Sequence, residues 1–300
     1  KQMLELVESI PQYFDEPMAD SSEIPTMLVS ALARKQVTVA LSGDGGDEFF
    51  CGYQMYQKLG QAQKLDAAGA LIYGISQLPG LKQANLLGRL PFSVRTIAQN
   101  RDKRYKTQLC SDKYLACVKS LTGTDQVRFD RELDYHVKNW QIRRMLLDMD
   151  TYLPGDILCK VDRASMKYSL EARCPILDQR VMEYSFRLPH SFKDHNGCQK
   201  YILKEIAYDY IPRELLDRKK TGFSVPLDKW LRGPLKNKLT DYASPAFLKQ
   251  QGLFDADAAS KLIADWLGAG DGGAYTGSNY SRIIWAFFIF QQWAERYLQA

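Results

Sequence analysis

The stretch from Val37 to Tyr53, VTVALSGDGGDEFFCGY, constrains the fold most, because a β-branched apolar run turns abruptly into a loop of glycines and carboxylates. Residues 37–41 form a short, continuous apolar run, which is typical of a buried strand in a parallel sheet. Ligands of such sheets bind beyond the carboxyl ends of the strands. The pattern therefore predicts a binding site in the loop that follows Leu41.

This loop combines backbone freedom with oxygen ligands. Its glycines permit tight turns and a close approach of the backbone to a ligand, and they are Gly43, Gly45 and Gly46. Its hydroxyl and carboxyl side chains are Ser42, Asp44, Asp47 and Glu48. Exposed N–H groups suit phosphates and carboxylates suit Mg²⁺, so the composition indicates a phosphate or metal site.

Two common phosphate-binding motifs are excluded at this loop. A Walker loop needs Lys and then Ser or Thr directly after its last glycine, whereas Gly46 is followed by Asp47 and Glu48. A dinucleotide-binding loop needs the spacing G-x-G-x-x-G, which GDGGDE lacks. An acidic helix-capping turn after a strand is the purely structural alternative for the loop taken alone.

Composition excludes several other classes of protein. The chain of 300 residues is 45% apolar, which suffices for one large or two modest domains. Its longest apolar run, 283–290, is too short to span a membrane, and the amino terminus lacks a signal-peptide pattern, so we expect a cytoplasmic protein. The net charge of +5 is small and widely spread, which gives little support to nucleic-acid binding.

Cysteine spacing favours buried, reduced thiols over zinc ligands or disulfides. No C-x-x-C pair occurs and only 3 histidines are present. The cysteines are Cys51, Cys110, Cys117, Cys159, Cys174 and Cys198.

Helical patterns dominate the rest of the chain. A helix over 25–35, capped by Ser21 or Ser22, is expected to lead into the strand at Val37. After Gly52 the predicted helices are 54–63, 111–120, 131–150, 156–169, 178–187, 200–210, 226–239, 256–267 and 278–298. Because one strand cannot form a sheet, we expect the other strands before Lys1, in a longer protein.

Two further segments carry more charge than ordinary core helices. The first, TYLPGDILCKVDRASMKYSLEARCPILD (151–178), alternates charged and apolar residues, and its structural alternative is a solvated face with ion pairs. Asp178, at its end, suits a helix N-cap. The second, DRKKTGFSVPLDKW (217–230), places Lys219 and Lys220 between two helices, where a lysine can reach a phosphate. A solvated charge cluster is its alternative.

Together these segments resemble the synthetase domain of glutamine-dependent asparagine synthetases. The motifs SGDGGDE with F-x-x-G-Y, LP-x-DIL-x-KVDR-x-SM with SLEAR-x-P-x-LD, and RKKTGFSVP occur in the order of that family, over about residues 14 to 235. The resemblance implies a mostly α fragment of an α/β adenine-nucleotide-binding domain of the ATP-pyrophosphatase type. Residues 1–60 would end the α/β core, and 61–300 would be its helical remainder.

The resemblance also implies a two-stage reaction. A substrate carboxylate attacks the α-phosphate of ATP to give an acyl-adenylate and pyrophosphate, and ammonia from glutamine then displaces AMP to form an amide. ATP and Mg²⁺ are the implied cofactors. The implied partners are aspartate or another carboxylate acceptor and the glutaminase domain of the same polypeptide, and a homodimer is left open.

Residue roles follow from matching the family motifs. Lys220 matches the catalytic lysine, with Lys219 as the alternative, since Arg218, Lys220 and Phe223 fit Arg-x-Lys-x-x-Phe. At the loop, Ser42 and Gly43 match the nucleotide-contacting pair, Asp44 lies near the adenylate, Asp47 matches a ligand of Mg²⁺ and pyrophosphate, and Gly45 and Gly46 complete the binding loop. The residues that match a charged helix lining the same cleft are Lys160, Asp162 and Arg163. Glu171 and Arg173 are expected to brace that helix by ion pairs.

Departures from the family pattern are informative too. The pyrophosphate loop Ser-Gly-Gly-x-Asp-Ser and the leading cysteine of the glutaminase domain are absent, so this chain alone should neither hydrolyse glutamine nor adenylate a substrate efficiently. Aspartate-using members carry Thr and Arg before the strand, whereas no arginine precedes Arg34 here. The pattern DEP-x-x-DSS (15–22) resembles a branch of the family that includes amidotransferases linked to cell-surface polysaccharide loci, which implies a uronic acid as the alternative acceptor. Asp20, Ser21 and Ser22 would then contact the acceptor, or they simply cap a helix. A non-catalytic helical interaction module is the third hypothesis.

Overall fold

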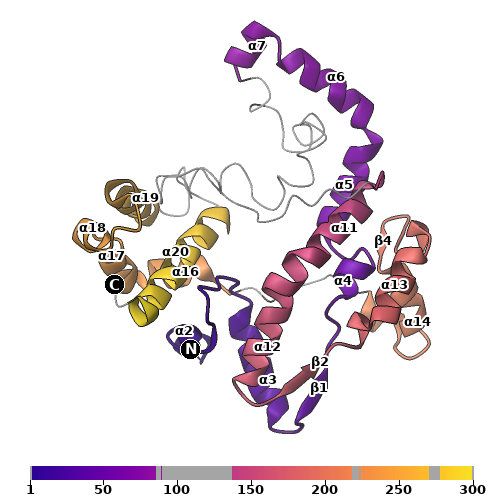
Figure 1. Cartoon of the computed structure of the whole chain (residues 1–300), viewed down its shortest axis with the longest axis horizontal. Helices are drawn as coiled ribbons and strands as arrows, with labels where there is room; N and C mark the ends of the chain where they lie inside the picture. The colour runs from indigo at the N-terminus through magenta and orange to yellow at the C-terminus, as the bar shows by residue number, and fades with distance from the viewer. Residues whose placement is uncertain are drawn as a thin grey trace.

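The structure, a computed structural model, describes residues 2–85, 89, 137–217, 223, 225–269 and 278–298. Helices predominate among them, which confirms the mostly α prediction (Figure 1). The amino-terminal elements are α1 (Gln2–Val7), α2 (Ile10–Tyr13), α3 (Glu23–Arg34), β1 (Val39–Leu41), α4 (Gly46–Phe49), α5 (Gln54–Lys64), α6 (Asp66–Ser76) and α7 (Pro79–Gln83). The predicted helix 111–120 lies outside the described residues.

The central elements carry most of the charged motifs. They are α11 (Trp140–Asp150), the π-helix η1 (Leu153–Leu158), α12 (Cys159–Met166), β2 (Glu171–Arg173), the 3₁₀ turn η2 (Pro175–Leu177), α13 (Gln179–Arg187), the 3₁₀ turn η3 (His190–Phe192), β3 (Asp194–His195) and β4 (Cys198–Gln199). The carboxyl-terminal elements are α14 (Tyr201–Ala207), α15 (Arg213–Leu216), α16 (Leu227–Arg232), α17 (Lys236–Tyr242), α18 (Pro245–Gln251), α19 (Ala256–Gly268) and α20 (Ser278–Tyr297).

The predicted strand forms, but its partner comes from within the chain. β1 pairs in parallel with β2, so that Val39 lies opposite Glu171 and Leu41 opposite Arg173. The expectation of a single strand was therefore wrong. Sequence could not show this pairing, because the short segment EAR has no strand-like periodicity and is held by ladder bonds to a distant strand.

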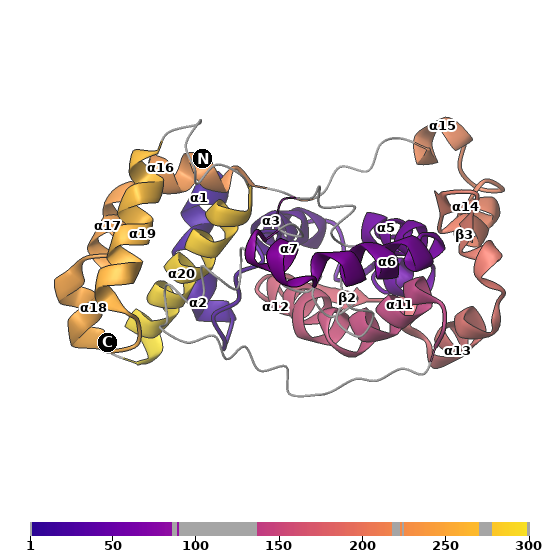
Figure 2. The same ribbon diagram turned by 90° about the horizontal axis from the view of Figure 1, so that it is seen from above.

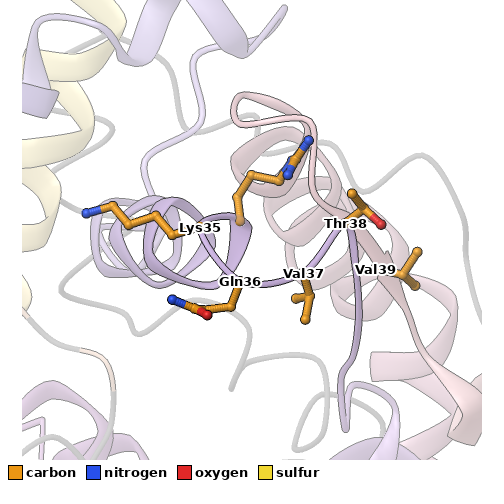
Figure 3. Close-up of a pocket in the computed structure, with 6 residues that line it drawn as sticks. Lys35, Gln36, Val37, Thr38 and Val39 are labelled. Carbon is orange, nitrogen blue, oxygen red and sulfur yellow. The ribbon is translucent and has the colours of Figure 1, made fainter.

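Burial of β1 was also predicted wrongly. The side chains of Val37, Val39 and Leu41 are 44%, 40% and 73% exposed. Figure 3 shows Val37 and Val39 on the shallow surface hollow that residues 34–39 line. Within the described part of the chain β2 is the strand that pairs with β1, so the side of β1 away from β2 has no strand against it.

The main hydrophobic core gathers both ends of the described chain. In Figure 2, α16–α20 pack together with α1 and α2, separately from the elements around β2 and α11. Trp266 of α19 and Trp285 of α20 are fully buried there, and Ile24, Met27 and Ala164 extend the same core to α3 and α12. Smaller clusters of buried residues surround α4, one centred on Phe49 and Phe50 and another on Cys51 and Tyr56.

Some helix boundaries differ from the predictions for local reasons. The predicted helix 226–239 is two helices, α16 and α17, because Gly233 and Pro234 interrupt it. The described part of the predicted helix 131–150 begins only at Trp140, where the Asn139 side chain accepts from the N–H groups of Gln141 and Ile142. None of the described helices is long and apolar enough to cross a membrane.

Candidate functional site

The glycine loop, residues 42–46, follows the carboxyl end of β1 and leads into α4, which lies beside α11 and α13 (Figure 1). Ser42 donates its backbone N–H to the carbonyl of Arg173 at 2.8 Å, which ties the start of the loop to β2. The Ser42 hydroxyl donates to the Asp44 carboxylate and lies 3.4 Å from the Cys174 sulfur. The first polar groups of the loop are thus held where the two parallel strands end, as the strand pattern predicts.

The three glycines of the loop lie in different structural surroundings. Gly45 has φ of +87°, and a Cβ there would lie 2.4 Å from Leu177 Cδ2, so a side chain is excluded twice. A Cβ on Gly46 would lie 3.7 Å from the ammonium nitrogen of Lys200, whereas one on Gly43 would meet nothing within 4 Å. Gly43 therefore lies at the open side of the loop, and Gly46 lies against a lysine.

That lysine is a site residue that the sequence analysis missed. Lys200 Nζ lies 2.9 Å from Asp47 Oδ2, and both side chains remain partly exposed, at 30% and 22%. A Cβ on Gly52 would come within 2.1 Å of Asp47 Oδ1 and 2.2 Å of Lys200 Cε, so the ion pair depends on that glycine. The structure thereby joins a cation to the predicted metal ligand.

Lys200 reaches Asp47 because a small hairpin positions it. β3 pairs antiparallel with β4 around Asn196 and Gly197, which have φ of +51° and +87°. Lys200, itself at φ of +54°, then donates its N–H to the carbonyl of Phe50 at 3.2 Å. The dipeptide Asn-Gly is the sequence signal for such a turn and would have located the hairpin.

Glu48, next to Asp47, has a different environment. Its carboxylate is buried and accepts from the Tyr53 hydroxyl at 2.6 Å. Burial raises the pKa of Glu48, an effect that the hydrogen bond from Tyr53 reduces. Asp47 is therefore the acidic side chain of α4 that stays partly exposed, in its ion pair with Lys200.

The charged helix α12 is anchored to the segment before α3. Lys160, whose side chain is only 8% exposed, forms ion pairs with Asp20 and, at 3.3 Å, with Asp156. Arg163 pairs with Asp15, while Asp162 is exposed. Among the described residues, the ion pairs of Lys160 and Arg163 include acids of this segment and none of the glycine loop. The nucleotide-binding role of Lys160, Asp162 and Arg163 therefore stays a prediction. The solvated-face alternative does not hold for Lys160, because it is buried.

The other predicted polar contacts have mixed outcomes. Glu171 and Arg173 form an ion pair of 2.8 Å with each other on β2, so the ion pair found does not brace the charged helix as predicted. Asp178 caps α13 through the N–H of Arg180, which confirms the N-cap. Ser22 precedes α3 but makes no side-chain cap, because its hydroxyl donates to Asp20 at 2.7 Å. That capping prediction was wrong.

Asp156 provides a pH test of the Lys160 cluster. Burial, together with the charge of Asp20, raises the pKa of Asp156 to about 6 against the opposing effect of Lys160. An acid whose pKa is higher in the folded than in the unfolded state stabilises the fold below its unfolded pKa, and this stabilisation is lost as the pH rises through the folded value. Asp156→Asn should therefore gain stability relative to the native chain between about pH 4 and about pH 7.

Urea unfolding at the two ends of that range measures the gain. We expect about 1 kcal/mol in favour of Asp156→Asn near neutral pH, a value discounted for solvent screening because the side chain is 30% exposed. Asp162→Asn, an exposed position on the adjoining helix α12, is the matched control and should show no such trend. If the difference in unfolding free energy between Asp156→Asn and the native chain does not change with pH, the raised pKa of Asp156 is contradicted.

The four described cysteines differ in burial. Cys51 is fully buried, whereas Cys159, Cys174 and Cys198 are half-buried, so the prediction of buried thiols holds only for Cys51. All four are free thiols, as expected, and Cys110 and Cys117 lie outside the described residues. The candidate catalytic lysines Lys219 and Lys220 also lie outside them, although Phe223 of the same motif is described and exposed.

Comparison with known proteins identifies the family. The model of the asparagine synthase family matches residues 1–295. The chain is 31% identical to asparagine synthetase [glutamine-hydrolyzing] 1 of Bacillus subtilis, over 94% of this chain and 44% of the relative. It is 30% identical to a putative asparagine synthetase of Mycobacterium tuberculosis, over 96% of this chain and 44% of the relative.

A more distant relative carries a different name. A protein of Gibberella zeae named as an amidase is 22% identical over 84% of this chain and 41% of its own length. The chain thus spans less than half the length of these relatives. With its family-model match over nearly the whole length and the glycine loop at the ends of two parallel strands, the chain belongs to the asparagine synthase family.

Proposed function

We propose that the full-length protein is an ATP-dependent amide synthetase, which activates a carboxylate as an acyl-adenylate and completes the amide with ammonia from glutamine. The observation that carries the proposal is the Asp47–Lys200 pair beside the glycine loop, at the carboxyl ends of two parallel strands. Carboxylates are poor acylating agents, and adenylation supplies the leaving group that they lack. The names of the relatives support the same reaction class.

The residues of the chain can divide this work between them. Ser42 and Gly43, at the open side of the loop, are suited to contact the nucleotide, and Asp44 holds the Ser42 hydroxyl in place. The ammonium of Lys200 is suited to the phosphate oxygens, on which negative charge increases as pyrophosphate leaves. Lys220 would neutralise the charge that develops on the α-phosphate, in the role that its motif suggests.

Asp47 fits a magnesium ion. Its carboxylate is partly exposed, lies beside the glycine loop and passes close to Gly52, where a Cβ would lie 2.1 Å from Asp47 Oδ1. Mg²⁺ in nucleotide sites is held by one or two carboxylates together with substrate phosphates and water. Bound there, Mg²⁺ would neutralise phosphate charge and favour the departure of pyrophosphate.

Asp47→Asn tests this metal role. The substitution keeps the size of the side chain and removes its charge, so we expect the concentration of Mg²⁺ required for half-maximal pyrophosphate release to rise at least tenfold. Asp44→Asn changes another carboxylate of the same loop, the one that accepts from the Ser42 hydroxyl, and it is the matched control. It should change turnover more than the Mg²⁺ requirement. An unchanged Mg²⁺ titration in Asp47→Asn would count against the metal role.

The charges around the segment before α3 bear on the choice of acceptor. Two cations that contact this segment already pair with acids, Lys160 with Asp20 and Asp156, and Arg163 with Asp15. An acceptor with two carboxylates, such as aspartate, needs further positive charge, whereas a hydroxylated acid with one carboxylate needs less. This favours a uronic acid as the second candidate, and the naming of one relative as an amidase agrees with variation of substrates among relatives.

One experiment separates the candidate functions. Pyrophosphate release by the full-length protein, measured across aspartate and a series of uronic acids, assigns the acceptor to whichever carboxylate stimulates it. If neither aspartate nor any uronic acid stimulates pyrophosphate release at any ATP concentration, the non-catalytic helical module remains as the function. The remaining partner assignments are proposals of the same kind: a glutaminase domain on the same polypeptide, additional strands against the open side of β1, a cytoplasmic location and a homodimer.

A further inference from the structure

A second cluster of chemically active side chains lies behind the glycine loop. Cys51 follows α4, His190 belongs to η3 and Asp194 begins β3. The Cys51 sulfur, a ring nitrogen of His190 and a carboxylate oxygen of Asp194 all lie within 4.8 Å of one another. Cys51 is fully buried and the other two are half-buried, so the cluster lies partly below the surface.

Gln141 of α11 contacts all three side chains and fixes the tautomer of His190. Its amide nitrogen donates to Asp194 Oδ2 at 3.0 Å and contacts the Cys51 sulfur at 3.6 Å, so its carbonyl oxygen is the atom that faces His190 Nε2, at 3.0 Å. Because a carbonyl oxygen only accepts, Nε2 must carry the proton of the neutral ring. Nδ1 is then an unprotonated lone pair, and this buried atom has no hydrogen-bond partner among the described residues.

The same contacts match the surroundings of metal-binding histidines. A ligating imidazole usually donates its other N–H to a carbonyl or carboxylate, which fixes the tautomer and the direction of the ring. Gln141 supplies that acceptor here. Gly60 makes room for it, since a Cβ at that position would lie 2.7 Å from Gln141 Oε1.

The charges and the donor atoms around the cluster determine which metal ion it can bind. Lys193, next to Asp194, is almost fully buried, with Nζ 4.3 Å from the centre of the Phe186 ring, and its positive charge opposes a cation. Binding therefore requires the Cys51 thiol to release its proton to solvent, so that a thiolate and a carboxylate together offset the two charges of a divalent ion. Sulfur and nitrogen donors favour ions of the zinc class over Mg²⁺ and Ca²⁺, which take oxygen ligands.

We propose that Cys51, His190 and Asp194 bind a divalent transition-metal ion of the zinc class. The fourth position would be open to water, because the carbonyl oxygen of Gln141 accepts from His190 Nε2. The site joins the segment after α4 to the hairpin that precedes Lys200, and the bond of 3.0 Å from Gln199 Nε2 to the Cys51 carbonyl links the same two segments. The ion would act as a structural cross-link that holds Lys200 against Asp47. Cys51 is far in sequence from His190 and Asp194, which is why no spacing motif reveals the three together.

Cobalt titration of the reduced, chelator-treated chain tests the site. We expect one equivalent of Co²⁺ to give the near-ultraviolet absorption of a thiolate-to-cobalt bond, Zn²⁺ to displace it, and Zn²⁺ to raise the unfolding temperature. Cys51→Gly should abolish the absorption and the thermal shift. Since Cys51 has φ of +59°, glycine relieves backbone strain there, and this variant should fold as well as the native chain.

Two further variants and two controls complete the test. His190→Gln and Asp194→Asn should each weaken Zn²⁺ binding at least tenfold. His195→Gln and Cys198→Ser change neighbours on the same hairpin that are not part of the cluster, and they should bind as the native chain does. Absence of the absorption, its persistence in Cys51→Gly, or equal weakening in His195→Gln would overturn the proposal. None of these measurements depends on synthetase activity.

Discussion

Lys220→Ala in the full-length protein is expected to abolish pyrophosphate release and to leave glutamine hydrolysis intact. A positioned cation that meets charge developing on a transferring phosphoryl group typically contributes about 10²–10³ in rate, and an alanine leaves that charge without a partner. Glutamine hydrolysis takes place in another domain in the proposed arrangement, so it reports on folding and on the integrity of the protein. Pyrophosphate release and glutamate formation, measured on the same preparation, give the two readings.

Lys219→Ala is the matched control for this experiment. The two lysines are adjacent in RKKTGFSVP, and only Lys220 has the spacing Arg-x-Lys-x-x-Phe. We expect Lys219→Ala to retain most of the pyrophosphate release. Normal release in Lys220→Ala with loss in Lys219→Ala would move the role to the neighbouring lysine, and normal release in both would reject it for the motif as a whole.

Lys200→Met is expected to reduce the rate of pyrophosphate release about 100-fold without unfolding the protein. Methionine keeps the length and the apolar stem of the side chain but removes the ammonium that lies 2.9 Å from Asp47. Because the ion pair is partly exposed, its loss should change the free energy of unfolding by no more than about 1 kcal/mol. The catalytic and structural effects can therefore be separated by measuring turnover and urea unfolding on the same variant.

Lys204→Met provides the matched control on the same helix. Lys204 lies about one turn beyond Lys200 and forms an ion pair of 2.9 Å with Asp217, away from the glycine loop. The Lys204→Met substitution should leave pyrophosphate release unchanged. Gly52→Ala should reproduce the Lys200→Met defect, because its Cβ would overlap both members of the pair. Full activity in Lys200→Met would remove this lysine from the phosphate site.

The local patterns that sequence predicted well were those in which neighbouring residues decide the structure. Apolar periodicity located α5, α19 and α20, and the short-range chemistry of Asp178 located the start of α13. The glycine loop was placed correctly after a strand, since a β-branched run followed by glycines leaves the backbone few alternatives. Helix breaks at Gly233 and Pro234 were also visible in the sequence, but the prediction gave too little weight to them.

Sequence by itself determined the order of the motifs, the composition of the glycine loop and the family that they indicate. Only the tertiary structure decided which distant groups meet: β1 with β2, Asp47 with Lys200, and Cys51 with His190 and Asp194. The physical reason is that each of these contacts joins segments far apart in the chain, and its geometry depends on hairpins, packing and close approaches at glycines. No local pattern of residue types records such a contact.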